Sequence, residues 1–481
     1  MAAQSTNDIT ALNPNSADDI TLALARMAID TPQDDIPASA FAAAQVAAMD
    51  ALGCAFAGHD APGVESVVEL TTHWGGRPEA TVWFQNARAP APAAALANSV
   101  QLHALDFDDY HPPSGAHITS VLVPAVLAAG EMNDSTGKET LAALILGVEV
   151  VGRLGRACQA RRDHEGFLPA SVICGFGATA AVCRLQEASV DETVNAIGIW
   201  YAHASGNRQA LFDRTLTKRI QPGIAARDAV FAACLAAKDF SGPRRIIGDQ
   251  PASLTRIYGF TGAARGVNSP PTVGEVMAER NTWTIEELEY KRFCTCGVSG
   301  PGIVAAISLA KEHGLVPEEI DTMRLFVPNI HSPFGAVPWG DHATPQVLAQ
   351  FCVPYAVASA IRNRRYGPDE IAPARIAQDS EVDRLARGTQ LCSWTDWKGD
   401  RPDAKTVLQA FLKDGRMVQS TDSDHRRYRS PHDDDALVEK FFHNVQFSDL
   451  VNAEETRDCL GALQTLEHYP DVALFIRRWL T

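Results

Sequence analysis

Side chains able to carry chemistry gather in one segment, Leu102–Pro124, which reads LHALDFDDYHPPSGAHITSVLVP. Three carboxylates and three imidazoles fall within fifteen residues, between apolar segments with helical periodicity. They are Asp106, Asp108, Asp109, His103, His111 and His117. Histidine titrates near neutral pH and a carboxylate beside it can orient it, so this composition suits general acid–base catalysis.

Three interpretations of this segment stay open from the residues alone. It is a solvated polar loop whose acids cap the next helix, a catalytic loop held between two core helices, or a metal site. Loops on a rigid scaffold often carry catalytic groups, which favours the second interpretation. The spacing matches no familiar ligand pattern, so we expect no metal.

Two further segments place cations beside turns. In Thr217–Arg227 (TKRIQPGIAAR), Lys218 and Arg219 precede a Pro-Gly pair and an Ala-rich helical pattern. In Glu289–Gly302 (EYKRFCTCGVSGPG), Lys291 precedes a turn rich in cysteine and glycine. Cations before a helix N-terminus favour anion binding, because the free N–H groups of the helix add to their field. The alternatives are exposed surface cations in the first segment and a surface turn in the second.

Motifs that mark several cofactor and hydrolase classes are missing. The sequence has no GxGxxG after a strand pattern, no Walker loop, no HExxH and no GxSxG. We therefore expect no nucleotide or nicotinamide cofactor.

Helical periodicity with small residues dominates the chain up to about residue 280. The predicted helices are Ala38–Gly58, Ala91–Leu105, Ile118–Met132, Thr136–Ala157, Ser171–Gln186, Asp191–Ser205 and Ala225–Lys238. Thr136 and Glu139 have the spacing of a capping box. Because alanine, glycine and cysteine on these faces let helices approach closely, the pattern predicts a tightly packed helical core.

The pattern changes after that point. Thr322–Pro328 is typical of a strand, and Lys405–Thr421 predicts two strands joined at Asp414-Gly415, a strong hairpin signal. Helical patterns lie between them at Pro301–His313 and Ala349–Arg362. After the polar segment 422–435, helical patterning returns and continues to residue 480.

These patterns predict a mainly α protein. A large all-helical domain is built from the N- and C-terminal segments, and a smaller α+β lid domain is inserted between them. We place the boundaries at residues 1–285 (with 1–20 a loose tail), 286–430 and 431–481.

Composition excludes several partners. The 481 residues carry 58 acidic and 42 basic side chains, a net charge of −16, which argues against nucleic acid and against an anionic membrane surface. The ten cysteines are irregularly spaced, as in a protein with reduced thiols. With no predicted membrane span and no signal-peptide pattern at the start, we expect a cytoplasmic protein.

At this point the motifs resemble those of the MmgE/PrpD family, which includes 2-methylcitrate dehydratase, cis-aconitate decarboxylase and iminodisuccinate epimerase. The resemblance runs from about residue 24 to residue 480, and its most specific piece is the run HALDFDD at 103–109. Other pieces are Asp50–Gly53, Gly58, Gly75–Gly76, Val123–Ala125, Leu146–Glu149, Gly175–Ala178, Thr217–Arg219, Gly223, Ala225–Arg227, Lys291, Gln350–Phe351 and Tyr355.

The resemblance implies a helical domain with an inserted α+β lid, an active site between them, a homodimer, no cofactor and a small di- or tricarboxylate substrate. Matched residue by residue, it assigns catalytic or pocket roles to Asp106, His117, Lys218, Lys291 and Tyr355. The lysines would hold substrate carboxylates. Tyr110, His111, Leu168 and Arg219 are added as substrate-binding candidates.

The sequence also departs from the family pattern. The loop reads His117-Ile118-Thr119 in place of His-Pro-Ser/Gly, and Leu168 stands where many members carry histidine. Two further pocket histidines are replaced, by Gln221 and Gly300, and Tyr110 stands where decarboxylase-like members carry threonine. These departures predict a substrate different from cis-aconitate, with fewer carboxylates or an apolar substituent near Leu168.

We therefore expect a cofactor-independent lyase, a dehydratase or decarboxylase, that moves a proton at a carbon next to a carboxylate. An isomerase or epimerase of a small dicarboxylate is the first alternative. A non-catalytic carboxylate-binding homologue is the second, favoured by the lost histidines.

Overall fold

In a computed structural model, helices make up most of the chain. The structure describes residues 19–160, 166–262, 271–327, 337–397, 403, 406–421 and 426–481. The predicted loose tail, except for its last two residues, lies outside the described residues. So do Pro328 and Lys405, at the ends of two predicted strands, and residues 422–425 of the polar segment.

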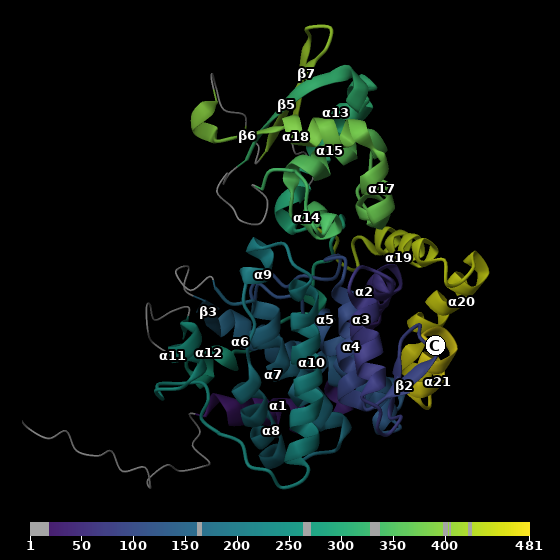
Figure 1. Ribbon diagram of the computed structural model, residues 1–481. Helices are drawn as coiled ribbons and strands as arrows, with labels where there is room; N and C mark the ends of the chain where they lie inside the picture. The colour runs from purple at the N-terminus through teal and green to yellow at the C-terminus, as the bar shows by residue number, and fades with distance from the viewer. Residues whose placement is uncertain are drawn as a thin grey trace, which may run out of the picture.

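The lower part of the molecule in Figure 1, here called the helical part, holds the N- and C-terminal helices. Its helices are α1 (Ile20–Asp30), α2 (Ala38–Gly58), α3 (Val64–His73), α4 (Ala91–His103), α5 (Thr119–Met132), α6 (Gly137–Ala157), α7 (Pro169–Leu185), α8 (Val190–His203), α9 (Gln209–Phe212), α10 (Thr217–Ala236), α11 (Leu254–Tyr258), α12 (Val273–Val276), α19 (Asp434–Ser448), α20 (Ala453–Gln464) and α21 (Val472–Trp479). Two small antiparallel pairs join it, β1 (Ala80–Val82) with β2 (Ala87–Ala89), and β3 (Cys158–Ala160) with β4 (Phe260–Gly262).

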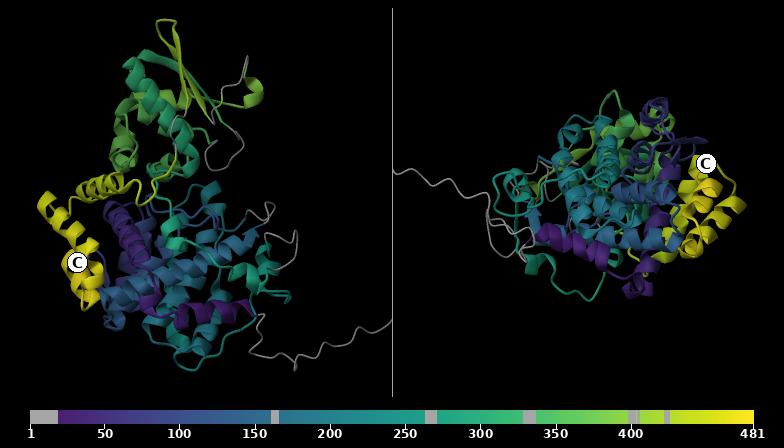
Figure 2. Two further views of the ribbon diagram at one scale, coloured as in Figure 1. Left: turned by 180° about the vertical axis from the view of Figure 1, so that it is seen from behind. Right: turned by 90° about the horizontal axis from the view of Figure 1, so that it is seen from below.

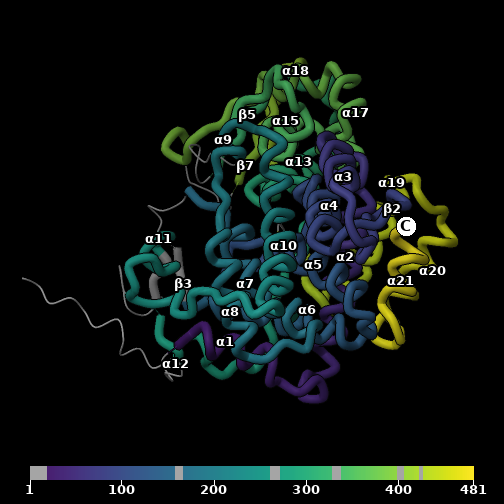
Figure 3. Tube along the Cα trace, turned by 60° about the horizontal axis from the view of Figure 1, so that its bottom comes forward, coloured from purple at the N-terminus to yellow at the C-terminus, as the bar shows by residue number. Residues whose placement is uncertain are grey.

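Small residues bring the core helices close together, as the sequence predicts. A Cβ on Gly177 of α7 would lie 2.2 Å from the carbonyl oxygen of Gly147 on α6, so only glycine fits this crossing. Helix α10 packs against both α4 and α7, and Figure 3 shows it between them. The predicted capping box of α6 is confirmed, because Thr136 and Glu139 bond each other's backbone N–H groups.

Helix α2 corrects one expectation about apolar length. It is long and apolar enough to cross a membrane by length and composition, and 83% of its most apolar window is buried inside the protein. A buried core helix passes the same test.

The upper part in Figure 1, here called the α+β part, lies between α12 and α19 in the chain. Its helices are α13 (Gly300–His313), α14 (Pro345–Gln350), α15 (Val353–Asn363), α16 (Pro368–Ile371), α17 (Pro373–Gln378) and α18 (Ser380–Gly388). Its strands are β5 (Ile320–Phe326), β6 (Gln390–Cys392), β7 (Val407–Leu412) and β8 (Met417–Thr421), which form one sheet in the order β6-β5-β7-β8.

The predicted hairpin is confirmed. Strands β7 and β8 pair antiparallel, with Val407 opposite Thr421 and Phe411 opposite Met417. Gly415 in the turn between them has φ +89°, a left-handed conformation that glycine adopts without strain.

Two predicted helices differ from the observed ones. Helix α10 begins at Thr217, well before the predicted start at Ala225, and Pro222 lies inside it. The pattern at 349–362 is split between α14 and α15, because Pro354 occupies the first turn of a new helix.

The C-terminal helices return to the helical part. Helices α19 and α20 pack against α2, and α21 packs against α5. Figure 2 shows these helices along one side of the helical part in both views. The exact domain limits at residues 286 and 430 stay a prediction.

Short ladders tie together the two segments that connect the parts. Tyr290 and Tyr428 exchange backbone hydrogen bonds of 2.9 Å each. Next to them, Tyr110 and Glu289 exchange bonds of 2.7 and 2.9 Å. The loop between α4 and α5 is thereby fastened to both connecting segments.

Candidate active site

The loop between α4 and α5, residues 104–118, carries the acid- and histidine-rich run. Asp109 fixes its far end by capping α5: its carboxylate accepts from the N–H groups of Ile118 (3.1 Å) and Thr119 (2.9 Å). Burial, with the neighbouring charge of Asp108, raises the pKa of Asp109 to about 7. Asp109 therefore has the structural, capping role that one interpretation of the sequence gave to the acids of this loop.

A buried ion pair supports the middle of the loop. Lys440 of α19 lies 2.7 Å from the carboxylate of Asp50 on α2 and donates to the carbonyl oxygen of Phe107 at 2.8 Å. Its ammonium also lies 4.0 Å from the centre of the Phe107 ring. Two helices distant in sequence, α2 and α19, thus hold the loop backbone beside the functional carboxylates.

Asp108 lies between two imidazoles. Its carboxylate is 2.9 Å from Nδ1 of His103 and 3.4 Å from Nδ1 of His117. The imidazole rings stand edge to face, with centroids 5.2 Å apart. Nδ1 of His117 is buried and makes no hydrogen bond among the described residues, but the charge of Asp108, 3.4 Å away, favours a proton on Nδ1, which leaves Nε2 as the basic nitrogen.

Asp106 receives two ammonium groups. Lys218 of α10 forms an ion pair with Oδ1, and Lys291 donates to Oδ2 at 2.8 Å and to the backbone carbonyl at 2.6 Å. Lys218 also lies 2.6 Å from Nε2 of His103. Asp106 has φ +54°, a strained conformation for a residue with a side chain, and these contacts hold it there.

Counting donors shows what these ammonium groups still offer. Each has three N–H groups, and each uses two of them on the partners just described. One N–H of Lys218 and one of Lys291 therefore remain without a protein partner in the part of the chain that the structure describes. Both are available to a substrate carboxylate.

The titration states follow from burial and these contacts. Burial, with the charge of Lys218, lowers the pKa of His103 to about 4. Burial and the nearby Lys291 likewise lower the pKa of His117. Although burial opposes it, the two ammonium groups hold the pKa of Asp106 well below its usual range. Despite its burial, the pKa of Asp108 is likewise held well below its usual range by the two histidines. At neutral pH His103 and His117 are therefore neutral, and Asp106 and Asp108 are ionised.

These groups open onto a cavity of about 350 Å³, here called the catalytic cavity. One wall is polar and holds His103, Asp106, His117, Lys218 and Lys291. The other is mainly apolar and holds Leu168, Leu211, Phe351 and Val298. Tyr110, Arg208, Cys296, Gly297 and Arg427 are among the remaining lining residues.

The polar wall has the ligand types of a metal site, but ammonium groups already serve it. His103, Asp106, Asp108 and His117 each offer a ligand atom, all within 4.8 Å of one another. Lys218 contacts two of these residues and Lys291 contacts one, so the two ammonium groups supply positive charge where a cation would bind. His103, Asp106 and Asp108 are thus bonded by the chain's own residues, whereas Nδ1 of His117 has no hydrogen-bond partner among the described residues.

Six of the predicted site residues meet at this cavity. Asp106, His117, Lys218, Lys291, Tyr110 and Leu168 all line it. Lys218 does so from the first turn of α10, so the predicted placement of the lysine before a helix start is wrong.

Three predicted residues do not reach the cavity lining, because their polar groups are bound elsewhere. The Tyr355 hydroxyl donates to the carbonyl oxygen of Glu370 at 2.8 Å, and its ring stacks on Trp339. Arg219 donates to Pro62 O (2.7 Å) and Gln346 Oε1 (2.9 Å).

His111 is the third. Its Nδ1 lies 2.9 Å from the Ser114 hydroxyl and its Nε2 lies 3.1 Å from Arg156. Burial, with the charge of Arg156, lowers its pKa to about 3. His111 therefore stabilises the conformation of the loop and does not line the cavity.

Other residues of the site were not among those predicted from the sequence. His103 lines the cavity and Asp108 lies buried beside it, and both belong to the run at 103–109. In the structure, Asp108 lies at Nδ1 of His117 while Asp106 lies 3.9 Å from Nε2. Arg427 comes from the segment taken as a polar linker, and no sequence signal marked it.

Comparison with known proteins covers most of the chain. Residues 22–258 match the MmgE/PrpD N-terminal domain, and residues 293–460 match the MmgE/PrpD C-terminal domain. The chain is 23% identical over 468 residues to the cis-aconitate decarboxylase-like protein oryM of Aspergillus oryzae, covering 94% of this chain and 96% of that protein.

Two further relatives are named cis-aconitate decarboxylase. The human protein is 24% identical over 444 residues, which cover 89% of this chain and 87% of the human protein. The protein of Aspergillus terreus is 28% identical over 300 residues, which cover 60% of this chain and 59% of the fungal protein.

Proposed function

Because the chain belongs to the MmgE/PrpD family, we propose that it is a lyase, a dehydratase or decarboxylase, for a small di- or tricarboxylate. The reaction proceeds by proton transfer at a carbon next to a carboxylate and uses the chain's own side chains. One observation carries the proposal: an imidazole oriented by a carboxylate faces the same cavity as two ammonium groups.

His117 is the general acid–base group in this proposal. Its Nδ1 lies 3.4 Å from the Asp108 carboxylate, whose charge favours the proton on Nδ1 and leaves Nε2 to take or give a proton. Because its pKa is lowered, the ring is neutral at pH 7 and starts the cycle as a base. The imidazolium formed is then stabilised by Asp108, as a buried carboxylate does for a catalytic histidine.

Lys218 and Lys291 supply the electrostatic stabilisation. Removing a proton next to a carboxylate sends negative charge onto the carboxylate oxygens, and positioned N–H donors stabilise that charge most. Each ammonium keeps one N–H for this task. Asp106 anchors both ammonium groups; since its pKa lies well below the usual range, it remains a carboxylate throughout.

The apolar wall limits the substrate. Leu168, Leu211 and Phe351 can neither donate a hydrogen bond nor pair a charge, so a carboxylate pressed against them would lose its solvation without compensation. The relatives are named for cis-aconitate, a tricarboxylate. We propose that this protein acts on a different acid, with an apolar substituent or a hydrogen on the side of Leu168.

Proton NMR in D₂O with a panel of di- and tricarboxylates tests the proposal. Loss of water or CO₂ from one acid, absent in the His117→Ala variant, is the expected result. Deuterium exchange or inversion without loss of a group would favour an isomerase or epimerase. Thermal stabilisation by carboxylates with no exchange at all would favour a non-catalytic binder. Efficient conversion of cis-aconitate to itaconate would overturn the substrate assignment.

The homodimer and closure of the α+β part as a lid belong to the same proposal. Small-angle X-ray scattering tests both. We expect a particle of twice the chain mass, and a smaller radius of gyration when a bound carboxylate is present.

A further inference from the structure

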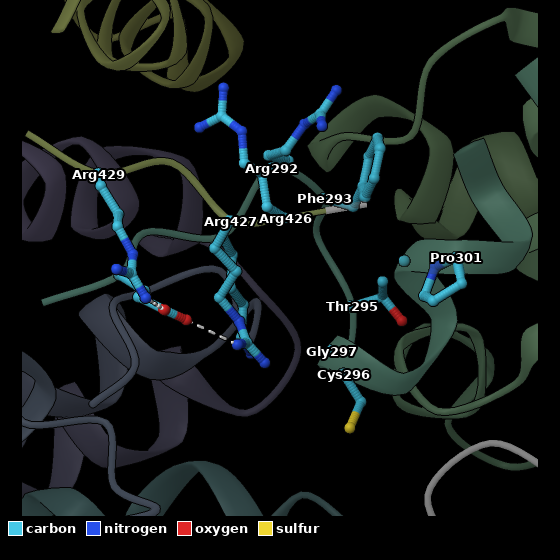
Figure 4. A pocket seen from close by; sticks show the side chains of 12 residues that line it. Arg292, Phe293, Thr295, Cys296, Gly297, Pro301, Arg426, Arg427 and Arg429 are labelled. Carbon is cyan, nitrogen blue, oxygen red and sulfur yellow. Dashed lines mark hydrogen bonds and ion pairs between the residues drawn. The ribbon is translucent and has the colours of Figure 1, made fainter. Parts of the chain in front are cut away.

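A second cavity, of about 580 Å³, adjoins the catalytic cavity and is rich in arginine. We call it the arginine chamber; it is shown in Figure 4. Its charged lining residues are Glu289, Lys291, Arg292, Arg426, Arg427 and Arg429. It lies where the two segments that connect the helical part and the α+β part pair through Tyr290 and Tyr428.

The two cavities share a wall. Lys291, Cys296, Gly297 and Arg427 line both of them. A molecule held in the catalytic cavity can therefore meet Arg427, which also faces the chamber. Of these four residues, Lys291 belongs to the proposed catalytic machinery, whereas Arg427 has no role in the proposed reaction.

The chamber has more positive charge than its carboxylate can balance. Arg427 and Arg429 both pair with Glu289. Figure 4 shows these two arginine side chains pointing into the same region. Two guanidinium groups on one carboxylate leave a local excess of positive charge. An anion that enters the chamber meets this excess directly.

Arg427 is held in place at the shared wall with donors to spare. Its guanidinium carbon lies 4.4 Å from the centre of the Tyr110 ring, and Nη1 donates to Glu289 at 2.9 Å. Its Nε is buried and has no hydrogen-bond partner among the described residues. A Cβ at Gly297 would lie 2.5 Å from Nη2, so glycine at that position leaves room for the guanidinium.

The other lining residues of the catalytic cavity narrow the choice. Leu168, Leu211 and Phe351 form an apolar cluster that offers an anion no hydrogen bond. Beside the two lysines, two arginines of the described residues line the cavity, Arg208 and Arg427, and of these Arg427 is the one that also lines the arginine chamber. A second anionic group of a substrate anchored at Lys218 and Lys291 therefore meets the chamber at Arg427.

We infer that the arginine chamber is the subsite for a second anionic group of the substrate, and that Arg427 binds that group. This inference rests on the proposed function and adds to it the residue that recognises the second anionic group of the di- or tricarboxylate. Arg427 acts as a specificity-determining residue, not as a proton-transfer group.

Matched pairs of acids test the subsite without any turnover. Succinate, glutarate and adipate are compared with butyrate, pentanoate and hexanoate, and dissociation constants are measured by ligand-detected NMR. We expect at least one dicarboxylate to bind roughly 10-fold or more tightly than its monocarboxylate partner, since a charge-assisted bond to arginine is lost in the latter. Arg427→Gln should abolish this preference, and Arg427→Lys should restore part of it.

Arg77→Gln is the matched control. Arg77 is 89% exposed, so this variant lowers the net charge equally while leaving both cavities intact, and it should keep the full preference. Equal binding of the paired acids by the unmodified protein would overturn the inference, as would a preference that survives Arg427→Gln. Inorganic phosphate gives a further readout: it should compete with the dicarboxylate. If phosphate binds without lowering the affinity for the dicarboxylate, the phosphate site lies outside the chamber, which would contradict the inference.

The outcomes separate this inference from the proposed function. A preference that depends on Arg427, in a protein that turns over no acid, would retain the subsite and refute the lyase. Turnover of an acid without any preference for dicarboxylates would support the lyase and refute the subsite.

Discussion

In the catalytic cavity and in the arginine chamber alike, two cations share one carboxylate: Lys218 and Lys291 pair with Asp106, and Arg427 and Arg429 pair with Glu289. The two cavities differ in what stands beside that carboxylate. His103 and His117 line the catalytic cavity next to Asp106, whereas no histidine of the described residues lines the chamber. We infer that proton transfer belongs to the catalytic cavity and that the chamber contributes affinity for anions.

Replacing His117 with alanine should lower turnover without changing the preference for dicarboxylates. We expect turnover of whatever acid is found to fall by about 10²- to 10⁴-fold, because the general acid–base group is lost. The preference for dicarboxylates should persist, since Arg427 is unchanged. Steady-state kinetics and the NMR binding measurement report the two effects separately.

His313→Ala, at an exposed position at the end of α13, is the control and should retain full activity. An active His117→Ala variant would remove this residue from the mechanism.

Lys440→Met tests how much the buried ion pair of Lys440 with Asp50, which supports the loop of the catalytic cavity, contributes to stability. It leaves the buried Asp50 carboxylate without its partner, and breaking a buried pair from one side typically costs about 3 kcal/mol or more of unfolding free energy. Urea denaturation measures the loss. Lys138→Met removes half of the exposed pair with Asp34 and should cost at most about 0.5 kcal/mol. Equal losses in the two variants would contradict the distinction.

Lys218→Ala should weaken binding of mono- and dicarboxylates alike, by about 1.5–3 kcal/mol, the range for a hydrogen bond to a charged group. Lys291→Ala should behave similarly. Loss confined to dicarboxylates is expected for Arg427→Gln instead. Lys238→Ala, at an exposed position, controls for net charge. Unchanged affinity in either lysine variant would exclude that residue from carboxylate binding.

The smallest expected effect is a shift of the pH profile. Since His117 must be neutral to act as a base and its pKa is lowered, kcat/KM should fall on the acid side with a midpoint below 6.5. Lys291 lowers this pKa and Asp108 raises it. The midpoint should therefore move up in Lys291→Met and down in Asp108→Asn, where the remaining activity is sufficient. Movement of both variants in the same direction would contradict the assignment of His117.

The elements that local pattern controls could be predicted from the sequence. Helix periodicity, the capping box at Thr136 and the hairpin at Asp414-Gly415 depend on neighbouring residues, and the structure confirms them. The start of α10 could not be predicted in this way. Pro222 and Gly223 together are typical of a turn, yet the helix continues through them. Packing of α10 against α4 and α7 offsets the backbone hydrogen bond that Pro222 cannot donate, and no local pattern shows that packing.

The site shows the same division. The run at 103–109 was recognisable because its residue types are unusual in an apolar core. Which carboxylate orients His117 was not, because the choice between Asp106 and Asp108 depends on the left-handed backbone at Asp106 and on lysines from two distant segments. Arg427 acquires its position only through the pairing of Tyr290 with Tyr428, which no local pattern encodes.

The pairing of Tyr290 with Tyr428 also indicates where the chain could be shortened. The chain leaves the helical part and returns to it at adjacent points, so residues 293–425 could be replaced by a short glycine-rich turn without separating the two ends. Closing such a turn costs little entropy, because the cost of closing a loop grows only with the logarithm of its length. The shortened protein would keep Lys291, Arg427 and the entire polar wall. Its folding and its binding of acids would show whether the helical part can function without the α+β part.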